Sequence, residues 1–198
     1  MSKKNILLIA FIFSMGLILM SCAGMPTKPT EANFKAPVVS LESVQVTQYN
    51  GFWYYDAKVA PTKGKPGANS AMLPMAFVFN ITNPNDFSVK LDGFGFTVAF
   101  EDFEVNLVNA FETQWIPAGK TNQISVVSIL DVQQVLLSLL IPNYEKVKAK
   151  NTNAWALLEK WWTEIPNMTV PIEVQKGAAT FTADGVQKVF PFSAKFPK

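Results

Sequence analysis

The chain has 198 residues, 49% of them hydrophobic, 13% aromatic and only 16% charged, which is the composition of a folded protein and not of a disordered one. It contains no histidine, no arginine and a single cysteine, which excludes Ser-His-Asp and Cys-His catalysis, histidine-ligated metal sites and arginine clamps on phosphate. Because the chain lacks these residue types, we expect no catalysis and no cofactor. Its 17 basic and 15 acidic residues form no basic patch, so we also expect no nucleic-acid partner.

The N-terminal residues have the layout of a secretory signal. Two lysines precede an almost wholly apolar run at residues 6–20, which is shorter than the ~20 residues of a membrane-spanning helix. The run closes with Leu19, Met20, Ser21 and Cys22, which resembles the lipobox of bacterial lipoproteins. That resemblance implies a signal peptide at residues 1–21, cleavage before Cys22, a diacylglycerol on its thiol and an acyl group on its new amine.

Lipidation of Cys22 would make the membrane a partner of the protein, since two or three acyl chains anchor firmly where one does not. Ala23 is not the aspartate that typically retains such a protein at the inner membrane. We therefore expect an anchor in the outer membrane, with the protein facing the periplasm. Residues 22–37 are rich in proline and predict an extended tether, so the folded domain is expected at residues 38–198.

From Val38 onward the dominant hydrophobic period is two. Alternating segments recur up to residue 127 and again at residues 168–196, separated by turn signals. Many short strands of this kind predict a mainly β protein, an antiparallel β-sandwich. Between the two regions the period becomes helical at residues 132–141 and 154–165, with Asp131 as a candidate N-cap and Pro166 as the stop. The pattern therefore predicts a two-helix element before the closing strands.

Two turn motifs divide the strands of the central segment, Asn83-Pro84-Asn85 and Ile116-Pro117-Ala118-Gly119. An apolar strand precedes the first motif, a strand pair follows it, and a valine-rich strand follows the second. This order resembles the type 2 late embryogenesis abundant family, also called the water stress and hypersensitive response domain. The resemblance implies a seven-stranded, fibronectin-III-like sandwich with a helix at one side, a role in desiccation or stress tolerance, and no known catalysis.

The second helical segment carries a pair of tryptophans, Trp161 and Trp162. Adjacent residues of a helix point about 100° apart, so both cannot lie in the middle of one core face. Either Trp162 covers the sheet while Trp161 lies at its flank, or the pair belongs to an exposed face that meets a membrane, a lipid or a partner protein.

The first helical segment is apolar on nearly every side. It either packs entirely in the core, or it encloses an apolar pocket together with the sheet, lined by Leu136, Leu139 and Leu140. Acidic side chains also cluster near a turn at Glu101, Asp102 and Glu104, a pattern typical of a solvated rim. Two functions follow as expectations: a lipid-anchored protective or interaction module, or a carrier of an apolar ligand such as a lipid at the membrane surface.

Overall fold

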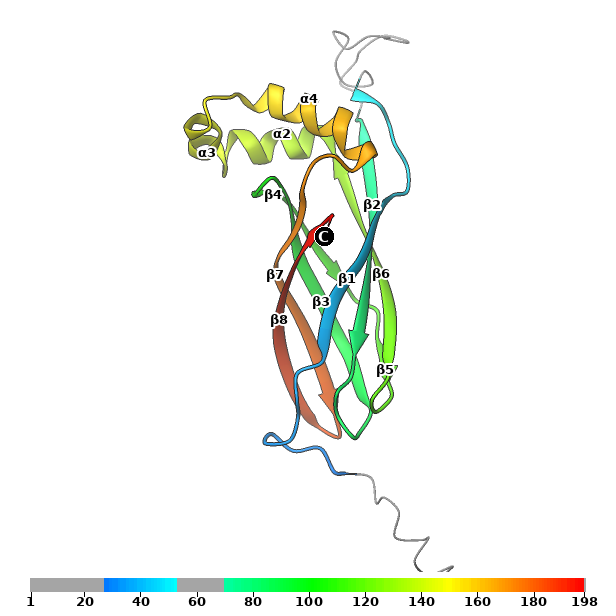
Figure 1. Ribbon diagram of the computed structural model, residues 1–198. Helices are drawn as coiled ribbons and strands as arrows, with labels where there is room; N and C mark the ends of the chain where they lie inside the picture. The colour runs from blue at the N-terminus through cyan, green and yellow to red at the C-terminus, as the bar shows by residue number, and fades with distance from the viewer. Residues whose placement is uncertain (1–26, 53–69, 198) are drawn as a thin grey trace, which may run out of the picture.

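The computed structural model describes residues 27–52 and 70–197 (Figure 1). The strands within these ranges are β1 (Val38–Val46), β2 (Met72–Thr82), β3 (Val89–Phe100), β4 (Phe103–Ala110), β5 (Gln114–Ile116), β6 (Thr121–Asp131), β7 (Ile172–Ala183) and β8 (Val186–Phe196). Between β6 and β7 stand the helices α2 (Val132–Leu140), α3 (Tyr144–Ala149) and α4 (Ala154–Glu164) and the 3₁₀ turn η2 (Ile165–Asn167). The predicted signal peptide, residues 1–21, and Cys22 lie outside the described residues.

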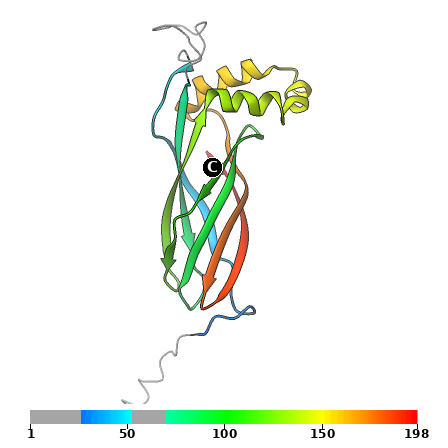
Figure 2. The same cartoon turned by 180° about the vertical axis from the view of Figure 1, so that it is seen from behind.

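The strands form two antiparallel sheets packed face to face (Figure 2). One sheet has the order β1-β2-β6, and the other has the order β4-β3-β7-β8 with the short β5 also paired to β3. This confirms the predicted antiparallel β-sandwich in a fibronectin-III-like arrangement, in which three strands lie against four long strands and the short β5. The three-residue β5 is an additional strand that the sequence pattern did not predict.

Phenylalanines from both sheets fill the space between them. Phe77 and Phe79 of β2 meet Phe96 and Phe94 of β3 edge to face, with ring centroids 5.3 and 5.0 Å apart. Side chains two apart in a strand point to the same face, so the alternating phenylalanines of each strand all face inward. Edge-to-face contacts of this kind add to the stabilisation from burial of the rings. The high phenylalanine content therefore serves the core of the sandwich.

A glycine allows β7 and β8 to approach closely at a bulge. The β7–β8 register shifts between Val174 and Gly177, and a Cβ built on Gly177 would lie 2.6 Å from the backbone oxygen of Phe192. Backbone cannot move aside as a flexible side chain can, so the approach requires glycine.

We therefore expect Gly177→Ala to lower the free energy of unfolding by ~1–3 kcal/mol through overpacking. Gly93→Ala is the matched control. Its new Cβ would lie 3.6 Å from the nearest atom, the Thr180 hydroxyl oxygen, which is ordinary van der Waals contact, so stability should change by less than ~0.5 kcal/mol. Urea denaturation of both variants measures the difference. Equal losses would show that the close approach at Gly177 does not constrain the fold.

The N-terminal segment is clamped to the end of the sandwich. Lys35 donates its amide to Asn85 Oδ1 (2.8 Å) and accepts from Asn85 Nδ2 (3.0 Å) through its carbonyl. Phe34 is only 5% exposed and packs edge to face against Phe87 and Phe190. The predicted tether at residues 22–37 is therefore wrong in its last part, because the chain joins the core at Phe34. One apolar side chain among prolines has no periodicity that could reveal this packing.

The three helices form a helical cap, residues 132–164, at the end of the sandwich opposite the N-terminal segment (Figures 1 and 2). β3 and β7 each have 12 residues, so the sandwich separates the two ends by ~40 Å. Asp131 Oδ1 accepts from the Gln133 amide at 2.9 Å, which confirms the predicted N-cap of α2. α3 was not predicted, because a six-residue helix shows less than two turns of hydrophobic period.

Candidate binding site in the helical cap

Side chains of the β3–β4 turn hold the helical cap against the sandwich through ion pairs. Glu101 and Asp102 both have positive φ, 49° and 77°, as the two central residues of a tight I′ hairpin require. Lys146 and Lys150 of the α3 region reach Asp102 with ammonium–carboxylate distances of 3.2 and 3.0 Å, and Lys160 of α4 pairs with Glu101. Glu104 of the same acidic cluster pairs with Lys176 of β7. The cluster is partly exposed, as predicted for a solvated rim, but Glu101 and Asp102 also hold the helices by ion pairs.

Trp161 and Trp162 of α4 are fully buried, so the hypothesis that this pair forms an exposed partner surface is wrong. Trp161 packs on the rings of Phe100 and Phe103, and its Nε1 donates to Glu101 Oε2 at 3.2 Å. The Trp162 carbonyl accepts a hydrogen bond at 2.8 Å from the hydroxyl of Tyr49, which lies in the segment after β1. The two side chains point about 100° apart, and both are buried because other parts of the protein cover α4 on more than one side.

Leu136, Leu139 and Leu140 do not line one pocket between sheet and helix. Leu136 and Leu139 are buried in the core, whereas Leu140 is 44% exposed on the outer side of α2. Leu139 and Leu140 do line a hollow, but it lies among the helices. The pocket prediction is thus wrong in its position and for Leu136, and the hollow that Leu139 and Leu140 line has an apolar wall as expected.

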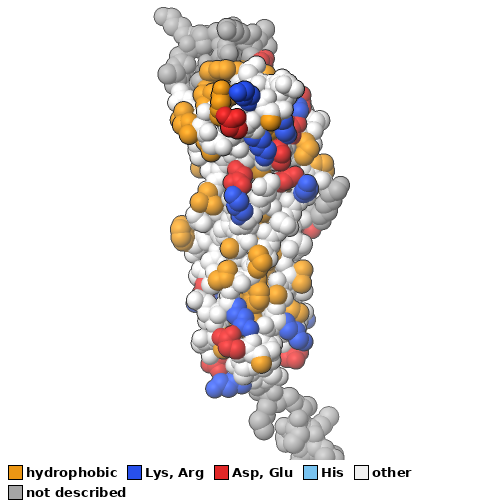
Figure 3. Space-filling model, turned by 90° about the vertical axis from the view of Figure 1, so that its left-hand side faces the viewer, with side chains coloured by type: hydrophobic (Ala, Val, Ile, Leu, Met, Phe, Trp, Pro, Cys, Tyr) orange, Lys and Arg blue, Asp and Glu red, His pale blue; other side chains and the backbone are white. Residues whose placement is uncertain are grey.

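We call this hollow the helical groove, and its volume is about 320 Å³. Its wall comes from the end of α2, from α3, from the connection between α3 and α4, and from the start of α4. Hydrophobic side chains gather on this end of the molecule beside a group of charged ones (Figure 3). The lining residues are Leu139, Leu140, Tyr144, Val147, Lys148, Thr152, Asn153, Ala154 and Trp155.

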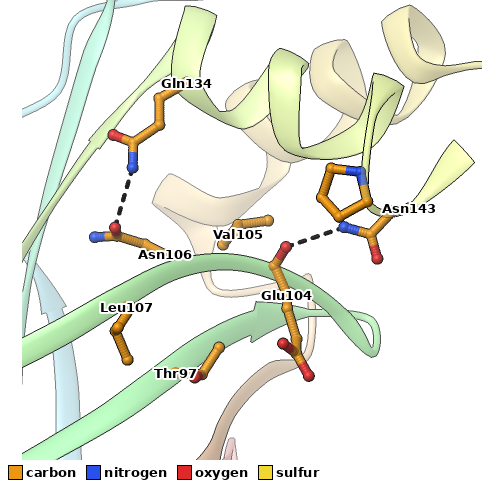
Figure 4. A pocket seen from close by; sticks show the side chains of 8 residues that line it. Thr97, Glu104, Val105, Asn106, Leu107, Gln134 and Asn143 are labelled. Carbon is orange, nitrogen blue, oxygen red and sulfur yellow. Dashed lines mark hydrogen bonds between the residues drawn. The ribbon is translucent and has the colours of Figure 1, made fainter.

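A second hollow, the seam pocket, lies between β4 on one side and the start of α2 and the α2–α3 connection on the other, and has a volume of about 540 Å³ (Figure 4). Its polar groups already bond one another. Gln134 Nε2 donates to Asn106 Oδ1 at 3.1 Å, and Asn143 Nδ2 donates to the Glu104 carbonyl at 3.1 Å. Satisfied donors and acceptors attract a ligand weakly, so the seam pocket is better explained as the joint between cap and sandwich.

Ion pairs lower the pKa of two carboxyl groups near the helical end of the sandwich. A hydrogen bond from Lys195, with a second from Gln175, holds the pKa of Glu173 below its ordinary value of 4.5. Burial by itself raises the pKa of Asp102, but the hydrogen bonds and charges of Lys150 and Lys146 outweigh it and hold that pKa below 3.8. Asp102 is half exposed, so its ion pairs contribute little to stability.

These shifts predict acid-sensitive stability. A carboxyl group whose pKa is lowered in the folded state stabilises the fold fully above its unfolded pKa, and that contribution disappears as the pH falls through the folded pKa. We expect the melting temperature to fall as the pH decreases below ~5 and Glu173→Gln to reduce the slope of that fall. Calorimetry at a series of pH values tests this, and an identical slope in wild type and variant would contradict it.

The described residues contain no group of three or more metal-binding side chains, and none of their helices is long and apolar enough to cross a membrane. No family model and no curated protein matches the chain. Among solved structures, it is similar to a protein from Archaeoglobus fulgidus at 15% identity and a TM-score of 0.38, covering 79% of this chain and 96% of that one. It is also similar to AT1g01470 from Arabidopsis thaliana, at 10% identity and a TM-score of 0.44, covering 88% and 87%.

Proposed function

We propose that this protein is a lipid-anchored, non-catalytic protein of the cell envelope, in which a rigid sandwich holds the helical cap away from the membrane as a protective or interaction module. The anchor is Cys22, in the outer membrane with the domain facing the periplasm. The observation that carries the proposal is the clamp on the N-terminal segment at Asn85, since it fixes where the chain leaves the domain.

The geometry supports an anchored orientation. Cys22 precedes Phe34 by 34 − 22 = 12 positions. A chain of 12 residues spans at most ~40 Å even when fully extended. An acylated Cys22 would therefore keep the clamped end of the sandwich within ~40 Å of the bilayer, and the helical cap would be the end remote from the point of attachment. A protective or partner-binding role fits this placement, because the cap is then free to meet proteins of the periplasm.

Chemistry among the described residues favours binding over catalysis. The chain has no histidine or arginine and only one cysteine. The acidic residues of the β3–β4 turn are engaged by lysines of the cap, so they are not poised as a pair of catalytic carboxylates. The resemblance to the type 2 late embryogenesis abundant family supports a role in stress or desiccation tolerance.

A second candidate function, binding or carriage of an apolar ligand, is favoured by the helical groove. Its volume falls at the lower end of the ~300–1,000 Å³ range of small-molecule sites, and much of its wall is apolar. The two functions differ in what occupies the cap: a protein surface in the first, a small amphiphile in the second.

Anchoring is tested by comparing wild type with Cys22→Ala in a Gram-negative host. We expect wild type in the outer-membrane fraction after high-salt washing. Because the variant has no thiol to acylate, we expect it to retain its uncleaved signal segment and to be absent from that fraction. Equal recovery of both chains in the outer membrane would contradict the proposal.

The protective role is tested separately, by survival of the same host after drying with wild type, Cys22→Ala or empty vector. Equal survival with wild type and empty vector would rule it out.

A further inference from the structure

We infer that the helical groove binds a single-chain amphiphile with an anionic head group, of the fatty-acid class. This inference rests on the second candidate function, ligand binding, and names the ligand that the groove fits. Three features of the cap lead to it: the size and wall of the groove, its one charged side chain, and its position in the molecule.

The size and wall of the groove suit one acyl chain. Leu139, Val147 and Ala154 form a buried floor, and Leu140 and Trp155, each about half exposed, stand at its sides. Leu140 and Trp155 expose most of this apolar surface to water, and covering it with an aliphatic chain is favourable because the water is displaced. A volume of about 320 Å³ lies at the minimum for small-molecule sites, which favours a single chain over a two-chain membrane lipid.

The charge of the groove selects an anionic head. Lys148 lines it, and no Asp or Glu is among its lining residues in the described part of the chain. Lys146 and Lys150, two positions before and after, pair with Asp102 on the other side of α3, whereas Lys148 takes part in none of the salt bridges between described residues. An ammonium beside an apolar wall attracts a carboxylate more strongly than one in open water. The Tyr144 and Thr152 hydroxyls line the same groove and can donate to that head.

The position of the groove favours a ligand that travels through water. The groove belongs to the helical cap, at the opposite end of the sandwich from the N-terminal segment (Figure 1). Two-chain lipids remain in a bilayer, whereas a single-chain amphiphile also exists as a dissolved monomer. With Cys22 anchored as proposed above, a site at this end lies away from the lipids around the anchor and meets the dissolved monomer.

The test is photo-crosslinking of the full chain, purified from membranes in a maltoside detergent. The probe is dodecanoic acid with a terminal diazirine, and the labelled peptides are identified by mass spectrometry. We expect labelling within residues 139–155. Labelling confined to other peptides, or no labelling, would overturn the inference.

Two leucines of α2 provide matched variants. Leu140 lines the groove and is 44% exposed, whereas Leu137 is 55% exposed and lies outside its lining. We expect Leu140→Glu to lower labelling about tenfold, because it places a carboxylate beside the bound acyl chain, and Leu137→Glu to change it less than about twofold. Equal losses in the two variants would mean that the label reports the stability of the helix and not the groove.

The head group is tested with Lys148→Gln and with the methyl ester of the same probe. We expect the substitution to lower labelling by the acid about fivefold and to leave labelling by the ester unchanged. Loss with both probes, or with neither, would overturn the assignment of an anionic head. The outcome is independent of anchoring, since Cys22 acylation and membrane recovery are measured on the same preparations without the probe.

Discussion

Replacing Asn83 with leucine is expected to lower the free energy of unfolding by ~3–5 kcal/mol. Asn83 is fully buried, and its Nδ2 donates to the carbonyls of Phe87 (2.8 Å), Ile116 (3.0 Å) and Pro117 (3.2 Å). Its Oδ1 accepts from the amide and the side chain of Asn85 at 3.0 and 2.9 Å. Leucine has a similar size but neither donates nor accepts, so several polar groups would lose partners out of reach of water, at ~1–3 kcal/mol each.

The same loss should loosen the N-terminal segment. Asn83 orients Asn85, and Asn85 holds both backbone groups of Lys35. We therefore expect the amide of Lys35 to exchange its hydrogen faster in Asn83→Leu than in wild type. Asn122→Leu is the matched control, since its amide donates to the exposed Trp115 carbonyl and its loss should cost less than ~1 kcal/mol. Chemical denaturation measures both variants, and similar losses would contradict a structural role for the first turn motif.

The second large effect is expected for Trp161→Ala, with a loss of ~3–5 kcal/mol. The indole is fully buried against Phe100 and Phe103, and truncation would leave a cavity where the helical cap meets the sandwich. The Glu101 carboxylate would also lose the hydrogen bond that it accepts from Trp161 Nε1.

Trp115→Ala is the control for this prediction, because that indole is 60% exposed and should contribute less than ~1 kcal/mol. Denaturation monitored by circular dichroism gives both free energies. A small loss at Trp161 would mean that the cap is not held by this residue, and it would reopen the hypothesis that the tryptophan pair serves a partner.

The sandwich could be predicted from sequence because the hydrophobic pattern that specifies its strands is local. A period of two over many short segments, with turn residues between them, places alternate side chains inward whatever the details of packing. Asp131 was predicted for the same reason, since an N-cap depends only on the residues that follow it. The order of strands around the motifs at residues 83–85 and 116–119 was also read from local sequence.

Features that depend on distant parts of the chain were not predictable. Phe34 gains its burial from Phe87 and Phe190, which are far away in sequence. Trp161 and Trp162 could not be placed from helical geometry alone, because a pattern shows which face of a helix is apolar but not how many elements cover it. The position of the helical groove was also not predictable, although Leu139 and Leu140 were predicted to line a pocket, since α3, which forms part of the wall, is too short to give a period.

The measurement that most directly tests the account is mass spectrometry of the N-terminal peptide of the protein purified from membranes. We predict a chain that begins at Cys22, with a diacylglycerol on the thiol and an acyl group on the amine. An unmodified Cys22, or a chain that still carries residues 1–21, would contradict the lipid anchor. The orientation in which the helical cap lies far from the membrane would then lose its basis.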